Sequence, residues 1–137
     1  MLTAADIMTR DVVTIRGSAT VAEAVAALRK NELRALIVDR RNLQDSYAIL
    51  TETDIVYKVI AYGIDASTIR VFEIMTKPCI GVRPDLGVEY IARLFANTGI
   101  RRAPVIGDRL LGIVSVSDIL HRGDAIEKPK SRLLQEE

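Results

Sequence analysis

Two short segments bring hydroxyl and carboxylate side chains together at the same spacing, Thr51-Glu52-Thr53-Asp54 and Ser115-Val116-Ser117-Asp118. Each follows an apolar run typical of a buried strand and precedes a helical pattern, so the aspartate falls in the first turn of a helix. A carboxylate there can accept hydrogen bonds from the vicinal hydroxyls of a ribose. A phosphate on that ribose would meet the neighbouring hydroxyls and the positive end of the helix dipole. These segments, which we call the carboxylate turns, therefore indicate sugar-phosphate binding.

A second interpretation of the carboxylate turns needs no ligand. Both match the capping box, in which a Ser or Thr and an acidic residue three positions later satisfy free backbone N–H groups at the start of a helix. A single copy of the pattern would favour the cap alone. Duplication beside matching apolar strands favours binding, and one aspartate can cap a helix and bind a ligand at once.

The rest of the chain is also duplicated. Asp6-Ile7-Met8-Thr9 is echoed by Glu73-Ile74-Met75-Thr76, at nearly the same separation as the two carboxylate turns. The difference in length falls in the loop at residues 40–46, which is longer than its counterpart at residues 107–109. Two copies of one supersecondary unit explain this pattern. We predict a first repeat over residues 1–63, a connector at 64–70, a second repeat at 71–123 and a charged, flexible tail at 124–137.

Hydrophobic periodicity predicts the same order of elements in both repeats, a short helix followed by strand, helix, strand, strand and helix. In the first repeat, the strands are expected at 12–15, 35–38 and 47–50, and the longer helices at 21–31 and 53–61. In the second repeat, the strands are expected at 80–82, 103–106 and 110–114, and the helices from Pro84-Asp85 to Gly99 and over 117–122. Mixed elements of this kind predict an α/β fold.

Composition excludes several classes of function. The 19 basic residues nearly balance the 18 acidic ones and are spread along the chain, so no surface for nucleic acid or an anionic membrane is expected. No apolar run approaches the roughly 20 residues that span a bilayer, and no cleavable signal is recognisable, so we expect a cytoplasmic protein. One His and one Cys provide neither a metal cluster nor a nucleophile–base pair, and Gly-rich phosphate loops are absent. We therefore predict that the chain is not an enzyme.

Three groups of residues resemble those of a cystathionine-β-synthase (CBS) domain pair, also called a Bateman module. They are the two Ile-Met-Thr openings, the Gly-Ile-Arg-Arg-Ala-Pro-Val stretch at 99–105 and the Gly-Ile-Val-Ser-Val-Ser-Asp stretch at 112–118. The resemblance covers residues 4–123. It implies a tandem pair of repeats related by pseudo-two-fold symmetry, each with a small β-sheet flanked by helices. It also implies a regulatory module that holds AMP, ADP, ATP or S-adenosylmethionine in clefts between the repeats, and that forms homodimers or higher oligomers.

The resemblance further implies that the aspartate of one repeat faces the first strand and the helix-to-strand corner of the other. Carried over position by position, one nucleotide-binding cleft comprises Thr51, Thr53, Asp54, Thr76, Cys79, Ile80, Ile100, Arg101 and Arg102. The other cleft comprises Thr9, Val12, Val13, Leu33, Arg34, Ala35, Ser115, Ser117 and Asp118. We call these the Asp54 cleft and the Asp118 cleft. No metal and no catalytic cofactor are expected in either.

The two clefts differ in their charged residues. Arg101 and Arg102 would place two guanidinium groups near the phosphates of the Asp54 cleft, which favours this cleft for the more tightly held or more highly phosphorylated ligand. The alternative is that both arginines form a solvated surface pair. Glu52, if it points inward, would repel a second or third phosphate and favour AMP over ATP. Ile37 stands where the second repeat has Pro104. The corner near Arg34 can therefore differ in shape from its counterpart, and an empty Asp118 cleft stays an alternative.

Two classes of function remain. The first is a regulatory module that binds and senses an adenine nucleotide, with AMP favoured, and that acts in trans on an unidentified target protein. The second is a ligand-independent dimeric scaffold that regulates a metabolic or redox-controlled enzyme, an analogy that rests on the fold. Stabilisation by a nucleotide distinguishes them, because only the first class binds one.

Overall fold

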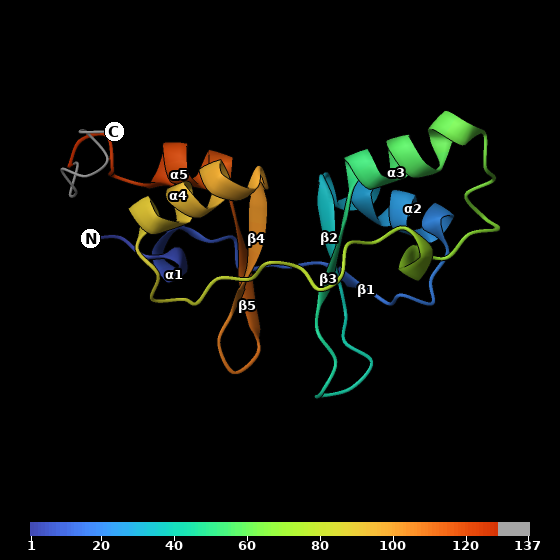
Figure 1. The fold of residues 1–137 in the computed structure, drawn as a ribbon, viewed down its shortest axis with the longest axis horizontal. Coiled ribbons are helices and arrows are strands. Elements are labelled where there is room, and N and C mark those ends of the chain that lie inside the picture. The colour runs from blue at the N-terminus through green and yellow to red at the C-terminus, as the bar shows by residue number, and fades with distance from the viewer. Residues whose placement is uncertain (129–137) are drawn as a thin grey trace. The chain divides into compact units, whose positions relative to one another are not determined.

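The computed structural model describes residues 1–128 and divides the chain into two compact units (Figure 1). We call Val13–Cys79 the central unit, and Met1–Val12 together with the chain from Ile80 onward the terminal unit. Of the tail expected at 124–137, residues 129–137 lie outside the described part. Each unit contains one small β-sheet with helices packed against it.

The central unit contains a three-stranded sheet in the order β1-β2-β3. Strands β1 (Thr14–Ile15) and β2 (Ala35–Val38) are parallel, because helix α2 (Val21–Asn31) connects them, and β3 (Ala48–Thr51) returns antiparallel to β2. Helix α3 (Glu52–Lys58) follows β3 directly, and the short 3₁₀ helices η1 (Ile60–Tyr62) and η2 (Val71–Glu73) complete the unit. The core gathers one apolar face of α2 and the buried residues of β2 and β3, including Val21, Leu28, Leu36 and Leu50.

The terminal unit repeats this plan with a two-stranded antiparallel sheet of β4 (Arg102–Ile106) and β5 (Leu110–Ser115). Helix α4 (Val88–Thr98) precedes the sheet, α5 (Val116–Arg122) follows β5, and α1 (Ala4–Ile7) comes from the beginning of the chain. The place of β1 is taken by an isolated parallel bridge between Val82 and Val105. Its core includes Ile7, Val88, Ile91, Phe95, Val105 and Val114.

Several expected boundaries shift. The strand expected at 12–15 contains only Thr14–Ile15, and the one expected at 80–82 is reduced to the bridge at Val82. The helix expected to begin at Pro84-Asp85 begins at Val88, because the preceding residues form a turn in which the Leu86 N–H donates to the Arg83 carbonyl. The helix expected over 53–61 is the α3 helix, which ends at Lys58, followed by η1. Helix α4 ends at Gly99, whose φ of 76° lies in the left-handed region that glycine favours.

The opening segment of each sequence repeat belongs to the compact unit of the other repeat. Residues 1–12 lie in the terminal unit, where Thr9 pairs with Ile113 of β5, and residues 71–79 lie in the central unit, where Thr76 pairs with Ile49 of β3. Each pairing uses two backbone hydrogen bonds, in which both residues donate and accept. The compact units therefore do not follow the order of the sequence repeats, and each unit is completed by a segment distant in the chain.

Gly112 permits the close approach of the first opening segment to β5. A Cβ atom at this position would lie 2.7 Å from both the Met8 sulfur and the Thr9 carbonyl oxygen. Because the oxygen belongs to the backbone, the added methyl must displace the opening segment. We expect Gly112→Ala to lower the free energy of unfolding by about 1–3 kcal/mol, the usual cost of overpacking. Urea unfolding measures this loss.

Gly107→Ala is the matched control for this prediction. A Cβ atom there would lie 3.2 Å from the end of the Leu111 side chain and 3.8 Å from the Pro84 ring, and it would meet no backbone atom within 4 Å. We expect a much smaller change, since a side chain can adjust where a paired backbone cannot. Equal losses for the two variants would contradict the close-approach explanation.

Candidate functional site

The carboxylate turn of the central unit forms a complete capping box. One Asp54 carboxylate oxygen, Oδ2, accepts hydrogen bonds from the Thr51 backbone N–H and hydroxyl, both at 3.0 Å. The Thr51 hydroxyl oxygen in turn accepts from the Asp54 N–H at 3.3 Å and lies 2.9 Å from the Thr53 hydroxyl. The other oxygen, Oδ1, lies 3.2 Å from the Lys58 ammonium, which also donates to the Ile74 carbonyl. The capping interpretation of this turn is therefore realised.

The terminal unit repeats the same geometry. Asp118 Oδ2 accepts from the Ser115 N–H at 2.8 Å and from its hydroxyl at 3.0 Å. Asp118 Oδ1 faces the Arg122 guanidinium at 3.8 Å, and that guanidinium donates to the carbonyls of Ile7 and Met8. Both aspartates therefore commit one oxygen to the cap and point the other at a cation one helical turn later.

The second carboxylate oxygen is the group that could bind a ligand. The Asp54 and Asp118 side chains are 13% and 12% exposed, whereas their partners Lys58 and Arg122 are 49% and 55% exposed. A half-exposed cation can turn toward a phosphate, at the cost of the partly buried hydrogen bonds that it donates to backbone carbonyls. The exposed hydroxyls of Thr53 and Ser117 lie at the start of the same helices. Each turn thus combines acceptors for a diol with a donor and a cation for a phosphate.

Each helix-to-strand corner lies beside the carboxylate turn of its own repeat. In the central unit, Ala35 pairs with Thr51, and the Arg34 carbonyl accepts from the Glu52 N–H at 3.1 Å. In the terminal unit, the Arg101 carbonyl accepts from the Val116 N–H at 2.9 Å. Arg102 likewise pairs with Ser115. Sequence reasoning missed this proximity, although two antiparallel strands of one hairpin necessarily bring their outer ends together.

The predicted clefts divide between the two units. Of the Asp54 cleft, the central unit holds Thr51, Thr53, Asp54, Thr76 and Cys79, and the terminal unit holds Ile80, Ile100, Arg101 and Arg102. Of the Asp118 cleft, the terminal unit holds Thr9, Val12, Ser115, Ser117 and Asp118, and the central unit holds Val13, Leu33, Arg34 and Ala35. In each unit, the carboxylate turn begins two residues after the strand residue that pairs with the opening segment belonging to that unit. The grouping of residues from different units stays a prediction.

The remaining site residues differ in exposure and chemistry. Cys79 is half-buried, and burial raises the pKa of its thiol, so less thiolate is present at neutral pH than for an exposed cysteine. This favours an apolar lining role over a nucleophilic one. Arg34 and Arg101 are exposed, whereas Arg102 is half-buried. Residues 1–128 contain no group of three or more His, Cys, Asp and Glu side chains that could hold a metal ion. None of the helices described for the chain is long and apolar enough to cross a membrane.

Comparison with known proteins identifies the family. The CBS domain model matches residues 4–61 and 71–124, nearly all of both repeats. The chain belongs to the CBS domain family, as the resemblance in the sequence predicted, and it carries two copies of the domain.

Among curated relatives, an uncharacterised protein of Methanopyrus kandleri is 31% identical over 117 residues, which cover 84% of this chain and 59% of that protein. The CBS domain-containing protein YhcV of Bacillus subtilis is 30% identical over 115 residues, which cover 83% of this chain and 80% of that protein. This chain therefore spans little more than half of the first relative and most of the second.

Solved structures confirm the α/β fold of two CBS repeats. A hexameric CBS-CP12 protein from bloom-forming cyanobacteria is 61% identical and has a TM-score of 0.93, covering 99% of this chain and 79% of that one. A CBS domain protein from Pyrobaculum aerophilum, complexed with AMP, is 22% identical with a TM-score of 0.82, covering 95% of this chain and all of that one. The second likeness is one of fold alone.

Proposed function

We propose that this chain is a regulatory module that binds an adenine nucleotide, with AMP favoured, and that acts without catalysis on a partner protein. The duplicated carboxylate turn carries the proposal. Each turn presents a second carboxylate oxygen, one exposed hydroxyl residue and a cation one helical turn away. These groups meet the separate requirements of a ribose diol and a single phosphate. The AMP complex of the Pyrobaculum aerophilum protein supports the proposal in so far as it places this nucleotide on the same fold.

AMP is favoured over ATP by the charge around the Asp54 turn. Glu52 is exposed in the first turn of α3, next to the hydroxyls that would receive a phosphate. One phosphate can be balanced by Lys58 or by an arginine of the corner. Each further phosphate adds negative charge near Glu52, and like charges at close range repel each other.

A ligand-independent scaffold is the second candidate, and the complete capping boxes favour it. Both turns satisfy their own hydrogen bonds without a ligand. Helices α3 and η1 also expose apolar side chains, including Val56, Tyr57, Ile60 and Tyr62. An assembly of several copies would cover such a surface, and the similar CBS-CP12 protein is a hexamer. In this scaffold function, the carboxylate turns serve only to cap their helices, and the chain provides a binding surface to its partner.

Thermal unfolding with a panel of adenosine compounds separates the two functions. We expect AMP at a hundredfold excess over its Kd to stabilise the folded protein by about 2.7 kcal/mol, since a ligand that binds only the folded state adds RT ln(1 + [L]/Kd). ADP, ATP, NADH and S-adenosylmethionine complete the panel, each at equal protein concentration because oligomers unfold in a concentration-dependent way. If none of them raises the unfolding midpoint while the protein keeps a defined oligomeric state, the scaffold is correct and the nucleotide proposal is wrong.

A further inference from the structure

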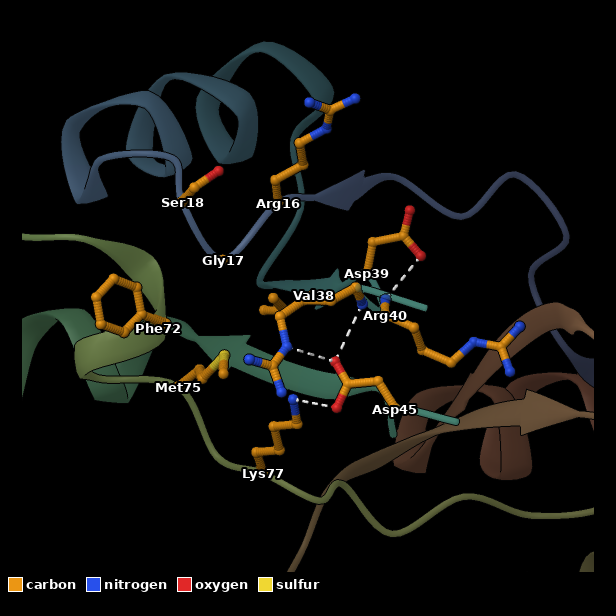
Figure 2. A pocket seen from close by; sticks show the side chains of 11 residues that line it. Arg16, Gly17, Ser18, Val38, Asp39, Arg40, Asp45, Phe72, Met75 and Lys77 are labelled. Carbon is orange, nitrogen blue, oxygen red and sulfur yellow. Dashed lines mark hydrogen bonds and ion pairs between the residues drawn. The ribbon is translucent and has the colours of Figure 1, made fainter. Parts of the chain in front are cut away.

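A cavity of about 750 Å³ lies in the central unit, outside both carboxylate turns (Figure 2). Its walls come from three segments, which are the chain after β1 at Arg16 to Ser18, the loop after β2 at Val38 to Asp45, and the segment from Phe72 to Lys77. None of the residues of the two predicted clefts lines it. The volume lies within the range typical of small-molecule sites.

The cavity and the carboxylate turn lie at opposite ends of the central sheet. Strand β2 begins beside Arg34, next to Thr51, and ends at Val38, which lines the cavity. At roughly 3.3 Å per residue, the span from Arg34 to Asp39 is on the order of 15 Å. Because β1 runs parallel to β2, its end also leads into the cavity, at Arg16. A ligand in the cavity would therefore be separate from one at the Asp54 turn.

An ion-pair network fixes one wall of the cavity. Asp45 lies 2.6 Å from the Lys77 ammonium, and it accepts hydrogen bonds from the Arg41 N–H at 3.0 Å and from the Arg41 guanidinium at 3.1 Å. These donors hold the pKa of the Asp45 carboxyl well below its usual range, and the side chain is only 8% exposed. Figure 2 shows Lys77 and Asp45 meeting at the lower edge of the cavity. One carboxylate thus positions two cations.

The lining carries more positive than negative charge. The lining contains four basic residues and two acidic ones, Asp39 and Asp45, and Asp45 is already paired with two cations. Within residues 1–128, Arg16 has no hydrogen bond or ion pair to its guanidinium and is exposed. Arg40 lies over the Tyr47 ring, 4.6 Å from its centre, which restrains the side chain without neutralising it. The excess charge would be balanced by an anion.

The other side of the cavity is apolar. Phe72 is 56% exposed although it is aromatic, and Met75 and the buried Val38 complete this side. The Phe72 N–H donates to the Gly17 carbonyl, which holds the base of the ring beside the end of β1. Figure 2 shows Phe72 and Met75 on one side, and Lys77 and Asp45 on another. The cavity therefore offers an exposed ring and sulfur across from a group of cations.

The longer loop of the first repeat supplies the cationic wall. Arg40, Arg41 and Asp45 lie in the loop at residues 40–46, for which the second repeat has only residues 107–109. The carboxylate turns occur in both repeats, whereas the cationic wall has no counterpart in the second repeat. A site that belongs to one unit alone is expected to differ in this way.

We propose that this cavity binds a small organic phosphate, with its phosphate against Arg41 and Lys77, the two cations that Asp45 holds, and its ring or apolar body against Phe72. Planar guanidinium groups pair with phosphate through two parallel hydrogen bonds. An exposed phenylalanine provides a face on which a flat group can stack. The site is independent of the nucleotide proposed for the carboxylate turns.

Ligand-observed saturation-transfer NMR on the full chain tests the site, with phenyl phosphate as the probe. We expect phenyl phosphate to bind more tightly than inorganic phosphate or benzyl alcohol, each of which matches only one side of the cavity. Arg41→Gln should raise its Kd about threefold, the effect of losing one solvent-exposed charge pair. Phe72→Ala should raise it about fivefold through lost stacking.

Two variants of the same unit serve as matched controls. Arg29→Gln removes an exposed arginine from the last turn of α2, and Tyr62→Ala removes a 77% exposed ring from η1, both outside the cavity. We expect the Kd of phenyl phosphate to be unchanged in both, and saturating AMP to leave its signal in place. Equal weakening by cavity and control variants, the absence of any binding, or full displacement by AMP would each overturn the proposal. The last result would assign the probe to the nucleotide site.

Discussion

Replacing Leu50 by alanine should lower the free energy of unfolding by about 3 kcal/mol, within the range of about 2–5 kcal/mol for buried leucines. Leu50 is fully buried in β3 and pairs with the equally buried Leu36 of β2. Truncation removes its methyl groups from the core and leaves a cavity that the paired strand β2 and the surrounding core side chains cannot close. Since whole domains are stable by about 5–15 kcal/mol, the variant should fold but unfold at a clearly lower urea concentration.

Leu43→Ala is the control, because it removes the same atoms from a side chain that is 81% exposed. We expect a change close to zero for this variant. Urea unfolding of both proteins at one protein concentration provides the comparison. An unchanged slope of the free energy of unfolding against urea concentration would show that the unfolded state is unaffected. If both variants lost the same stability, the core described for the central unit would be wrong.

The Leu50 variant also connects the core with the site. Thr51, the next residue, accepts the hydrogen bond that caps α3 and donates two to Asp54. Alternation along β3 buries Leu50 and leaves Thr51 half-buried at the edge. The position of the carboxylate therefore depends on how firmly the strand before it is held. Nucleotide affinity should fall together with stability in Leu50→Ala, and not in Leu43→Ala.

The carboxylate turns could be predicted from the sequence because their information is local. A Thr or Ser that follows an apolar strand and precedes an acidic residue by three positions marks the start of a helix. The whole signal lies within six or seven residues. The structure contains both capping boxes as expected, with Asp54 and Asp118 at the same place in their helices. The longer strands also followed from local pattern, since the buried runs expected at 35–38, 103–106 and 110–114 lie within β2, β4 and β5.

The exchange of the opening segments could not be predicted in the same way. Met8 and Met75 look equivalent in the sequence, and nothing local states which sheet each opening segment joins. The choice depends on pairing over long separations, between Thr9 and Ile113 and between Ile49 and Thr76. A trace of it is visible in Gly112, whose missing side chain admits Met8 and Thr9. A glycine in a buried strand indicates the close approach of another backbone without naming it.

The cationic cavity was also invisible to pattern analysis. Its residues come from three segments without helical or strand periodicity, and no motif unites Arg16, Asp45 and Lys77. In the sequence, the longer loop of the first repeat differs from its counterpart only in length and carries no motif. What organises it is the pairing of Asp45 with Arg41 and Lys77, which depends on the folded positions of all three. Loops of this kind encode function through tertiary contacts, and sequence spacing alone does not disclose it.

Asp54→Asn and Asp118→Asn should separate the binding role of each carboxylate turn from its capping role. Asparagine keeps the size of the side chain, but it offers one acceptor oxygen and no charge. Loss of a hydrogen bond to a charged group costs about 1.5–3 kcal/mol, so AMP affinity should fall about tenfold to a hundredfold at a turn that binds it. Isothermal titration calorimetry measures both the affinity and the number of sites. The stability cost should be that of a weakened cap, about 1 kcal/mol or less.

The chain supplies its own controls, because helices α1 and α2 also begin with a capping box in which a threonine precedes an acidic residue by three positions. Glu23→Gln weakens the box with Thr20 at α2 in the central unit, and Asp6→Asn weakens the box with Thr3 at α1 in the terminal unit. Neither residue belongs to a predicted cleft, so both should lose a little stability and no AMP affinity. If they weakened AMP as much as the cleft variants, the loss would reflect a destabilised fold, and the carboxylates would have no role in binding the ribose.

The two aspartate variants also assign the nucleotide to a cleft. Loss of AMP binding in Asp54→Asn alone would favour the cleft predicted to contain Arg101 and Arg102, and partial loss in both variants would favour two occupied sites. Because Asp54 and Asp118 have nearly equal exposure and the same cap geometry, any difference must come from the residues around them. Lys58 lies 3.2 Å from Asp54 and donates to one carbonyl, that of Ile74, whereas Arg122 lies 3.8 Å from Asp118 and donates to two. If Asp54→Asn loses AMP and Asp118→Asn retains it, Lys58 is the cation that turns toward the phosphate. The reverse result assigns that role to Arg122.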